Sequence, residues 1–400
     1  MEPVTHFLTG ACIGRAGFNR KTACATLAAV LAAEAADLDI IWGFAGPVEE
    51  LKHHRGITHT FWAVPVVAGV VVGAVWLLDR WLKRRRRHEA SVRKAAADPS
   101  TRPGTPGLAQ DDNQLLPLRM TNNEEVRWGW LYLTACVAAL SHLLLDWTNN
   151  YGVRPFFPFN PRWYAGSFMF IAEPVMWALL FLALFMPWVL GLADREIGAR
   201  KQRFRGRGWA IFALCGMLML GCWRWAEHAQ ALVMIGNAPI STEPALRAAA
   251  EPYPVNPFRW HAIVETPNLY QTAEVNTRTG SIDSDPLRDV LYKPADTAAV
   301  EAAKRTGLGK VYLDWGTWAV VRDVGPEPIP GAIQGLEPPN LPPGRAWTTV
   351  EFSDLRFDYS FLAKGGTIPG TAGHAPLSGW VYIVDGHEDA GEVMNGREQR

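Results

Sequence analysis

The strongest local signal of chemistry is a histidine and an aspartate four residues apart, His142 and Asp146, near the end of an apolar run. Positions i and i+4 of an α-helix share one face, so this imidazole and this carboxylate can bind one cation. Imidazole together with carboxylate suits zinc, and also manganese or iron. The alternative is a helix-end histidine that hydrogen-bonds to its own carboxylate.

Other ionisable residues lie in or beside apolar runs, where each costs roughly 2.5–3.5 kcal/mol at the centre of a membrane helix. Asp37 and Asp39 are two residues apart and cannot face the same way within a helix. Either the helix unwinds there, or one carboxylate binds metal while the other orients a ligand. The alternative is a pair of ordinary acidic residues in an outer loop. Glu173 stands alone in its apolar run and should be paired or functional.

The string His53-His54-Arg55-Gly56-Ile57-Thr58-His59 adds imidazoles and a guanidinium just before another apolar run. His59 is a candidate ligand whose second ring nitrogen needs an acceptor. Arg55 suits an anionic oxygen such as that of a phosphate. His53 and His54 are loop candidates, and one of them is expected to be merely solvated.

Apolar segments of the first half must position these groups, and a spanning helix needs roughly 20 mostly apolar residues. Four segments satisfy this requirement: Phe61–Leu82, Trp128–Trp147, Phe168–Leu192 and Trp209–Ile235. The Ala-rich segment Thr22–Ile41 suits a fifth helix packed inside a bundle. The shorter run Val4–Gly14 predicts a half-span or re-entrant helix. It contains the isolated His6, for which a packed, neutral core histidine is the alternative to a ligand.

Basic clusters predict the orientation of this bundle, because cytoplasmic loops carry an excess of Lys and Arg. The clusters are Lys83–Arg87, Arg195–Arg207, and Arg15 with Arg20 and Lys21. Placing all three in the cytoplasm needs no contradictory crossing. Residues 83–127 then form a polar cytoplasmic loop, expected to be disordered around Pro99–Gly107. Every candidate ligand is then expected at the outer end of its helix or in an outer loop.

The remainder, residues 236–400, alternates short runs of β-type residues with turns rich in Pro and Gly. The candidate strands are Trp260–Thr266, Tyr270–Val275, Val311–Asp314, Trp318–Arg322, Trp347–Phe352, Phe357–Phe361 and Trp380–Val384. The predicted fold is thus an α-helical membrane bundle over residues 1–235, with about five spanning helices and a short N-terminal half-helix. A small antiparallel β-rich soluble domain follows on the extracytoplasmic side.

Composition narrows the classes of partner. The 39 Lys and Arg residues equal the 39 Asp and Glu residues, so the overall charge gives no reason to expect nucleic acid. The five cysteines lie in or beside apolar segments without CxxC spacing, so neither a disulfide framework nor a thiolate zinc site is supported. No basic region precedes the first apolar stretch, so we expect no cleaved signal peptide.

Taken together, these motifs resemble those of the YdjM-like inner-membrane proteins, a family regarded as membrane-bound metal-dependent hydrolases. The resemblance runs through Thr5-His6-Phe7-Leu8, Asp37-Leu38-Asp39, His54-Arg55-Gly56-Ile57-Thr58-His59, His142-Leu143-Leu144-Leu145-Asp146 and Ile171-Ala172-Glu173-Pro174. It extends to Asn256-Pro257-Phe258-Arg259-Trp260 and Asp354-Leu355-Arg356-Phe357 in the tail. The pattern is also similar, more distantly, to zinc-dependent phospholipase C and P1-type nucleases, which are all-helical phosphoesterases.

The resemblance implies a metal site formed by His6, Asp37, His59, His142, Asp146 and Glu173, although the family pattern has Asp where Glu173 stands. We therefore expect one to three divalent cations, with zinc as the leading candidate. The leading hypothesis is hydrolysis of a phosphoester or lipid-like substrate at the outer surface of the inner membrane. In it Asp39 or Glu173 is a further ligand or general base, and Arg55 clamps the substrate anion.

Two other classes of function stay open. A non-catalytic scaffold would use the metal to brace helices and the outer domain to recruit a partner. A transporter would need ionisable groups at several depths, forming a path, whereas the candidates here gather on one side only. Oligomeric state and the identity of the substrate lie beyond the sequence.

Overall fold

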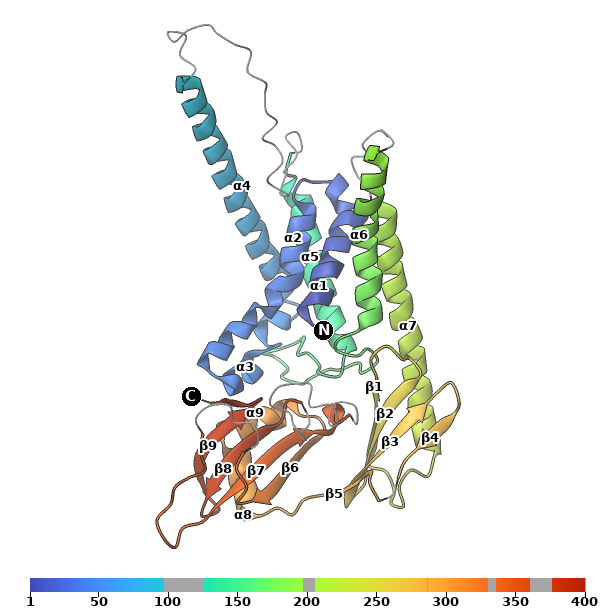
Figure 1. Ribbon diagram of the computed structural model, residues 1–400, viewed down its shortest axis with the longest axis vertical. Coiled ribbons are helices and arrows are strands. Elements are labelled where there is room, and N and C mark those ends of the chain that lie inside the picture. Colours follow the sequence, from blue (N-terminus) through green and yellow to red (C-terminus); the bar gives the residue numbers. More distant parts are fainter. Residues whose placement is uncertain (97–124, 197–205, 286, 330–335, 360–375, 400) are drawn as a thin grey trace.

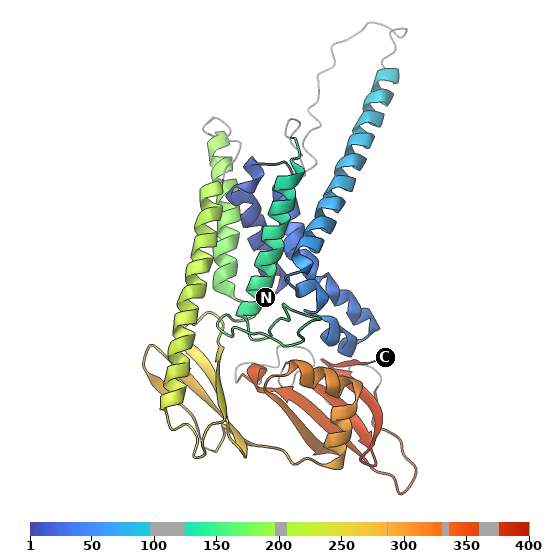
Figure 2. The same cartoon turned by 180° about the vertical axis from the view of Figure 1, so that it is seen from behind.

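The computed structural model describes residues 1–96, 125–196, 206–285, 287–329, 336–359 and 376–399. The first half of the chain forms a bundle of helices, and the second half forms β-sheets that lie against one end of that bundle (Figure 1). The view from behind shows the same arrangement, with the N-terminus at the end of the bundle that faces the sheets (Figure 2). The predicted order of a helical part followed by antiparallel sheets is confirmed.

Within the described ranges, four helices are long and apolar enough to cross a membrane. They are α4 (Ala63–Ala96), α5 (Trp128–Thr148), α6 (Pro174–Glu196) and α7 (Arg207–Asn237). The expected fifth span, Thr22–Ile41, is not confirmed. It contains α2 (Ala25–Glu34), which is only 10 residues long, and the start of the 3-10 segment η2 (Ala35–Ala45). At 1.5 Å per residue, α2 covers about half of the hydrocarbon core.

Small side chains explain how the two short helices fit inside the bundle. Helix α1 (Pro3–Ala16) packs along α2, whose face of Ala25, Ala28, Ala29, Ala32 and Ala33 is buried. A Cβ atom at Gly10 would lie 2.8 Å from the carbonyl oxygen of Ala29, and one at Gly14 would lie 2.5 Å from Cα of Thr26. Glycines four apart allow such close backbone approach between membrane helices.

Helix α4 differs from expectation at its far end. It continues through the basic run Lys83–Arg87 to Ala96, because Lys and Arg are good helix formers and nothing in this stretch breaks the pattern. The helix therefore extends beyond residue 83, where the predicted loop 83–127 begins. The expected disorder around Pro99–Gly107 lies outside the described residues.

The second half forms two antiparallel sheets of five strands each within the described residues. The first contains β1 (Arg247–Pro252), β2 (Arg259–Glu265), β3 (Leu269–Asn276), β4 (Ser281–Asp283) and β5 (Val290–Tyr292). The second contains β6 (Ala319–Gly325), β7 (Trp347–Asp354), β8 (Gly379–Val384), β9 (Glu388–Met394) and β10 (Arg397–Glu398). The end of α7 packs on the first sheet, and α8 (Ala298–Arg305) packs on the second.

Two of the predicted strands are wrong. Val311–Asp314 lies in α9 (Gly307–Trp315), where the side chain of Thr306 caps the helix by accepting from the amide of Gly309. Leu308, Tyr312 and Trp315 then share one buried face at helical spacing, which overrides the local β-type residues. The second is Phe357–Phe361. Its first residue belongs to the 3-10 turn η4 (Leu355–Phe357), which forms because Asp354 accepts from the amide of Arg356. Residues 360 and 361 lie outside the described ranges.

Apolar clusters join the two halves of the chain, and one of them lies beside the candidate ligands. It contains Val48 and Leu51 of α3 (Pro47–His53), Tyr151 after α5, and Trp315, Phe352 and Val381 of the second half. Burying such side chains is worth roughly 1.5–3 kcal/mol each. The sheets are thus packed directly against the end of the bundle that carries the candidate ligands.

The contact between α1 and α2 gives a first prediction. Gly10→Val should force the two helices apart and lower the apparent Tm of the detergent-solubilised protein, by an overpacking cost of roughly 1–3 kcal/mol. Gly69→Val is the matched control, because a Cβ at Gly69 in α4 meets nothing within 4 Å. Equal Tm values for the two variants would contradict this account of the packing.

Candidate metal centre

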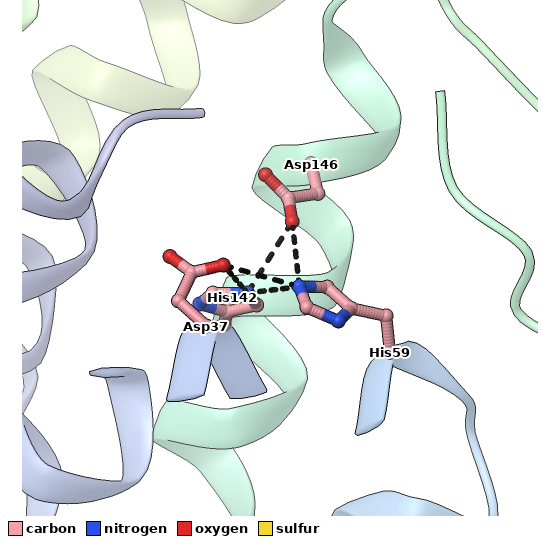
Figure 3. A group of neighbouring side chains, drawn as sticks. All are labelled: Asp37, His59, His142 and Asp146. Atoms are coloured by element: carbon pink, nitrogen blue, oxygen red, sulfur yellow. Dashed lines mark hydrogen bonds and ion pairs between the residues drawn. The ribbon is translucent and has the colours of Figure 1, made fainter. Parts of the chain in front are cut away.

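Four side chains from three separate segments converge at the end of the bundle that faces the sheets: Asp37, His59, His142 and Asp146 (Figure 3). Each offers one ligand atom, and the four atoms lie within 4.8 Å of one another. The Nε2 atoms of His59 and His142 are 2.9 Å apart, and each lies 3.3 Å from Oδ2 of Asp146. Oδ1 of Asp37 lies 3.2 Å from Nε2 of His59 and 3.5 Å from Nε2 of His142.

Local structure explains how each residue reaches this point. His142 and Asp146 share one face of the last turns of α5, as their spacing predicts. The α-helical pattern of α2 gives way at Ala35 to the tighter 3-10 geometry of η2, so Asp37 and Asp39 do not lie on a regular α-helix. His59 closes the short 3-10 turn η3 (Ile57–His59) immediately before α4.

Hydrogen bonds at the other ring nitrogens indicate where the protons lie. Nδ1 of His142 is 2.6 Å from the carbonyl oxygen of Ala33, which can only accept. Nδ1 of His59 is 3.0 Å from Oγ1 of Thr58 and 3.2 Å from Oδ2 of Asp39. In the neutral tautomers that donate at Nδ1, both Nε2 atoms carry lone pairs that point into the cluster.

In these tautomers the cluster is a set of acceptors that face one another. Oδ2 of Asp146 is buried and has no hydrogen-bond partner among the described residues. A proton on one imidazole would satisfy one pair of acceptors, whereas a divalent cation would satisfy all four. Two imidazoles and two carboxylates are a zinc-type donor set, and tetrahedral ligands with bonds of about 2.1 Å lie about 3.4 Å apart. The donor chemistry and the spacing fit such an ion.

Asp39 instead holds the His54–His59 segment in place. Its carboxylate accepts from Nδ1 of His54 at 2.9 Å, from the amide of Arg55 at 2.9 Å and from the hydroxyl of Thr58 at 3.0 Å. Asp37, Asp39 and His54 also lie close enough together to form a metal group. Because donors already occupy both oxygens of Asp39, the contacts favour the interpretation in which Asp37 binds and Asp39 orients.

Arg55 is buried beside the cluster and is bound on several sides by the protein. Its Nη2 lies 2.9 Å from Oδ1 of Asp146, and its Nη1 donates to Oδ1 of Asn149 at 3.2 Å and to the carbonyl of Gly152 at 2.9 Å. The guanidinium also covers the ring of Tyr151 at 4.6 Å. In this arrangement Arg55 fixes the carboxylate of Asp146, and only its Nε has no partner among the described residues.

His6 lies at the edge of the group. Its ring stacks on that of His142 with centroids 3.8 Å apart, and its Nε2 is 3.4 Å from Oδ1 of Asp146. That oxygen also accepts from the amino group of Met1. His6 is thus close to the ligands, while the shared cluster of four does not include it.

Glu173 is not brought to the cluster. Its Oε2 pairs with Nη2 of Arg224 at 2.7 Å, and its Oε1 accepts from the amide of Val255 at 3.3 Å. Arg224 also donates to the carbonyl of Tyr253 at 2.9 Å. Both charged side chains are fully buried, so they tie the start of α6 and the middle of α7 to the first sheet. The signal for this pair was the single Arg inside the apolar run Trp209–Ile235.

A second missed residue, Arg356, connects the second half of the chain to the loop that follows α5. Its guanidinium donates to the carbonyl of Asn150 at 2.8 Å, and Nδ2 of Asn150 donates back to the carbonyl of Arg356 at 3.2 Å. Asp354 holds the same guanidinium through two contacts of 2.9 Å. Residues 149–152 are therefore held by Arg55 on one side and by Arg356 of the second half of the chain on the other. Arg356 belongs to the string Asp354–Phe357, which contributed to the family resemblance but did not indicate what these residues contact.

Glu251 of β1 is fully buried at the same junction. Ser167 and Asn150 lie beside its carboxyl group, whose Oε2 has no hydrogen-bond partner among the described residues. Burial raises the pKa of Glu251 to about 8, although the guanidinium of Arg356 acts in the opposite direction. The folded chain therefore holds a proton here that an unfolded chain would release near pH 4.5.

Comparison with known proteins gives one match. The family model described as YdjM inner membrane protein matches residues 1–231. The matched range contains the whole cluster and ends before the first sheet. No curated protein and no solved structure matches the chain, so the expected likeness to phospholipase C and P1-type nucleases is not shown.

The buried Glu251 predicts a pH dependence. Its stabilising contribution should be complete below about pH 4.5 and should be lost as the pH rises to about 8, because the folded state binds the proton more tightly. Glu251→Gln mimics the protonated form, so its apparent Tm should fall less than that of wild type between these pH values. Glu301→Gln, on the exposed face of α8, is the control. Parallel Tm profiles for wild type and Glu251→Gln would contradict the assignment.

Proposed function

Since the chain belongs to the YdjM inner membrane protein family, we propose that it is a membrane-bound, metal-dependent hydrolase. The proposed substrate is a phosphoester, either lipid-like or small, and the proposed site of reaction is the outer surface of the inner membrane. The observation that carries this proposal is the convergence of four possible ligand atoms, from Asp37, His59, His142 and Asp146, within 4.8 Å of one another.

The proposed roles follow from the contacts. Asp37, His59, His142 and Asp146 would hold the ion, with zinc as the leading candidate, and His6 packs behind His142. Asp39 orients His59, and Arg55 orients Asp146. A divalent cation in such a site makes water nucleophilic near neutral pH and stabilises the negative charge that develops on a phosphoryl oxygen. Asp37 is the most exposed of the four, with 16% of its side chain accessible, so a substrate would approach from its side.

The location of the reaction follows from the distribution of charge. The basic residues of the turn between α1 and α2, and the basic run of α4, belong to the end of the bundle away from the sheets. If that end is cytoplasmic, as the positive-inside tendency favours, the cluster and the sheets of residues 236–400 are extracytoplasmic. The cluster would then lie near the depth of the lipid headgroups, which supports a phosphoester of a lipid as substrate.

Burial favours a second candidate function, a non-catalytic scaffold. The side chains of His59, His142 and Asp146 are at most 1% exposed. A closed site of four protein ligands is typical of structural zinc, whereas a catalytic ion keeps an open position. In this alternative the ion braces η2, η3 and α5, and the outer domain recruits a partner.

Metal content and activity together test the proposal. Wild-type protein purified without chelator should contain a stoichiometric divalent metal by elemental analysis and should hydrolyse a phosphodiester in detergent. His142→Ala and Asp146→Ala should lose both properties, because each removes a ligand. Glu173→Gln, outside the cluster, should retain the metal.

The outcomes separate the two candidates. Metal without hydrolysis of any phosphoester, and no change in the spectrum of the Co²⁺-substituted protein when phosphate is added, would favour the structural brace. Wild-type protein without stoichiometric metal would defeat both candidates.

The orientation is tested by labelling in intact cells. Leu287→Cys places a thiol at a position 91% exposed in the second half of the chain, and Arg84→Cys places one at the opposite end of the bundle. A membrane-impermeant maleimide should label the first variant and not the second, above the background from the native cysteines of wild type. The reverse pattern would place the sheets in the cytoplasm.

A further inference from the structure

A small cavity lies at the junction between the bundle end and the outer domain, outside the cluster of four acceptors. Its volume is about 190 Å³. Lys52 of α3, Arg154 and Trp163 of the segment after α5, and Lys310 and Asp314 of α9 line it. Trp315 and apolar side chains complete the walls. The lining thus brings three cationic side chains and one carboxylate from three separate segments to one place.

Arg154 is the central group of this cavity. Its side chain is only 7% exposed, and its guanidinium lies 4.5 Å over the ring of Trp163 and 4.7 Å from the ring of Phe157. Nη2 donates to the carbonyl of Lys52 at 2.7 Å, and Nη1 reaches Asp314 at 3.4 Å. Nε is buried and has no partner among the described residues. Burial lowers the pKa of Arg154, which reflects the cost of holding this charge away from water.

The charges around the cavity do not balance. Asp314 is shared, because its Oδ2 contacts both Nη1 of Arg154 and Nε1 of Trp163, the latter at 3.3 Å. Lys52 pairs with Glu49 at 2.8 Å on the exposed face of α3. No described carboxylate forms an ion pair with Lys310. Cationic groups gathered at a half-enclosed site repel one another unless an anion joins them.

The size of the cavity limits the ligand. A volume of about 190 Å³ corresponds to about six water molecules and is below the roughly 300 Å³ of sites for drug-sized ligands. One tetrahedral oxyanion fits such a space. Guanidinium and ammonium groups recognise phosphate by charge and by hydrogen bonds, and Trp163 and Trp315 restrict access of water.

We propose that this cavity binds a single phosphate group, and that the bound anion joins α3 and the Arg154–Trp163 segment to α9 of the outer domain. The phosphate belongs either to a free ion or to the headgroup of an anionic lipid, since both present the same oxygens. The proposal is independent of the metal-dependent hydrolase proposed above, because no residue of the acceptor cluster lines this cavity.

Calorimetric titration of the full-length protein in detergent tests this proposal. The protein is first treated with a chelator and then titrated with inorganic phosphate, and separately with water-soluble dihexanoyl phosphatidate. Lys310→Gln should weaken binding roughly fivefold, as expected for the loss of one partly exposed charge pair. Asp314→Asn should tighten it, because the competing carboxylate is neutralised. Lys304→Gln removes the same charge from α8, outside the cavity, and should leave the affinity unchanged.

Opposite changes in phosphate affinity in Lys310→Gln and Asp314→Asn support the phosphate site, because a purely structural effect would weaken phosphate binding in both variants. Tighter binding of the phosphatidate would identify a lipid headgroup as the source, and equal affinities would identify the free ion. Absence of saturable binding of both probes, equal effects of Lys310→Gln and Lys304→Gln, or weaker binding by Asp314→Asn would overturn the proposal. A protein that binds phosphate here but contains no metal would refute both metal-based functions considered above and would leave this phosphate site standing.

Discussion

The architecture depends on one electrostatic constraint: imidazole nitrogens and carboxylate oxygens face one another at the buried end of a helical bundle. Nε2 of His59 and Nε2 of His142 are 2.9 Å apart, and Nδ1 of His142 lies 2.6 Å from the carbonyl oxygen of Ala33, which can only accept. Such groups repel one another in a medium of low polarity unless a cation lies between them. The surrounding structure can be understood as the means of holding them in that arrangement.

Successive layers of packing supply the restraint. The glycines of α1 allow α2 to approach closely. The carbonyl oxygen of Ala33 in α2 lies within hydrogen-bond distance of Nδ1 of His142. The carboxylate of Asp39 accepts from the amide of Arg55, and the guanidinium of Arg55 pairs with Asp146. Arg356, from the second half of the chain, then holds the loop after α5. The second half is therefore in direct contact with the residues that support the cluster, although the match to the family ends at residue 231.

The sequence was most informative where chemistry and spacing coincide. Apolar length predicted four spans, and the i, i+4 rule placed His142 and Asp146 on one face. Apolar length alone overestimated the length of the helix in Thr22–Ile41, because alanine is apolar both in a spanning helix and in a short internal one. Glu173 looked like a ligand because sequence alone cannot show that Arg224 lies opposite it. Strand propensity failed at Val311–Asp314, where a capped helix buries its apolar face. Arg356 and Glu251 could not be assigned, since their partners come from distant segments.

The most direct test of the central claim is an anomalous-diffraction map of crystals grown without chelator, recorded on either side of the zinc absorption edge. The account predicts one peak at about 2.0–2.2 Å from Nε2 of His59, Nε2 of His142 and a carboxylate oxygen each of Asp37 and Asp146. A map with no peak there, or with a peak only between Asp39 and His54, would contradict it.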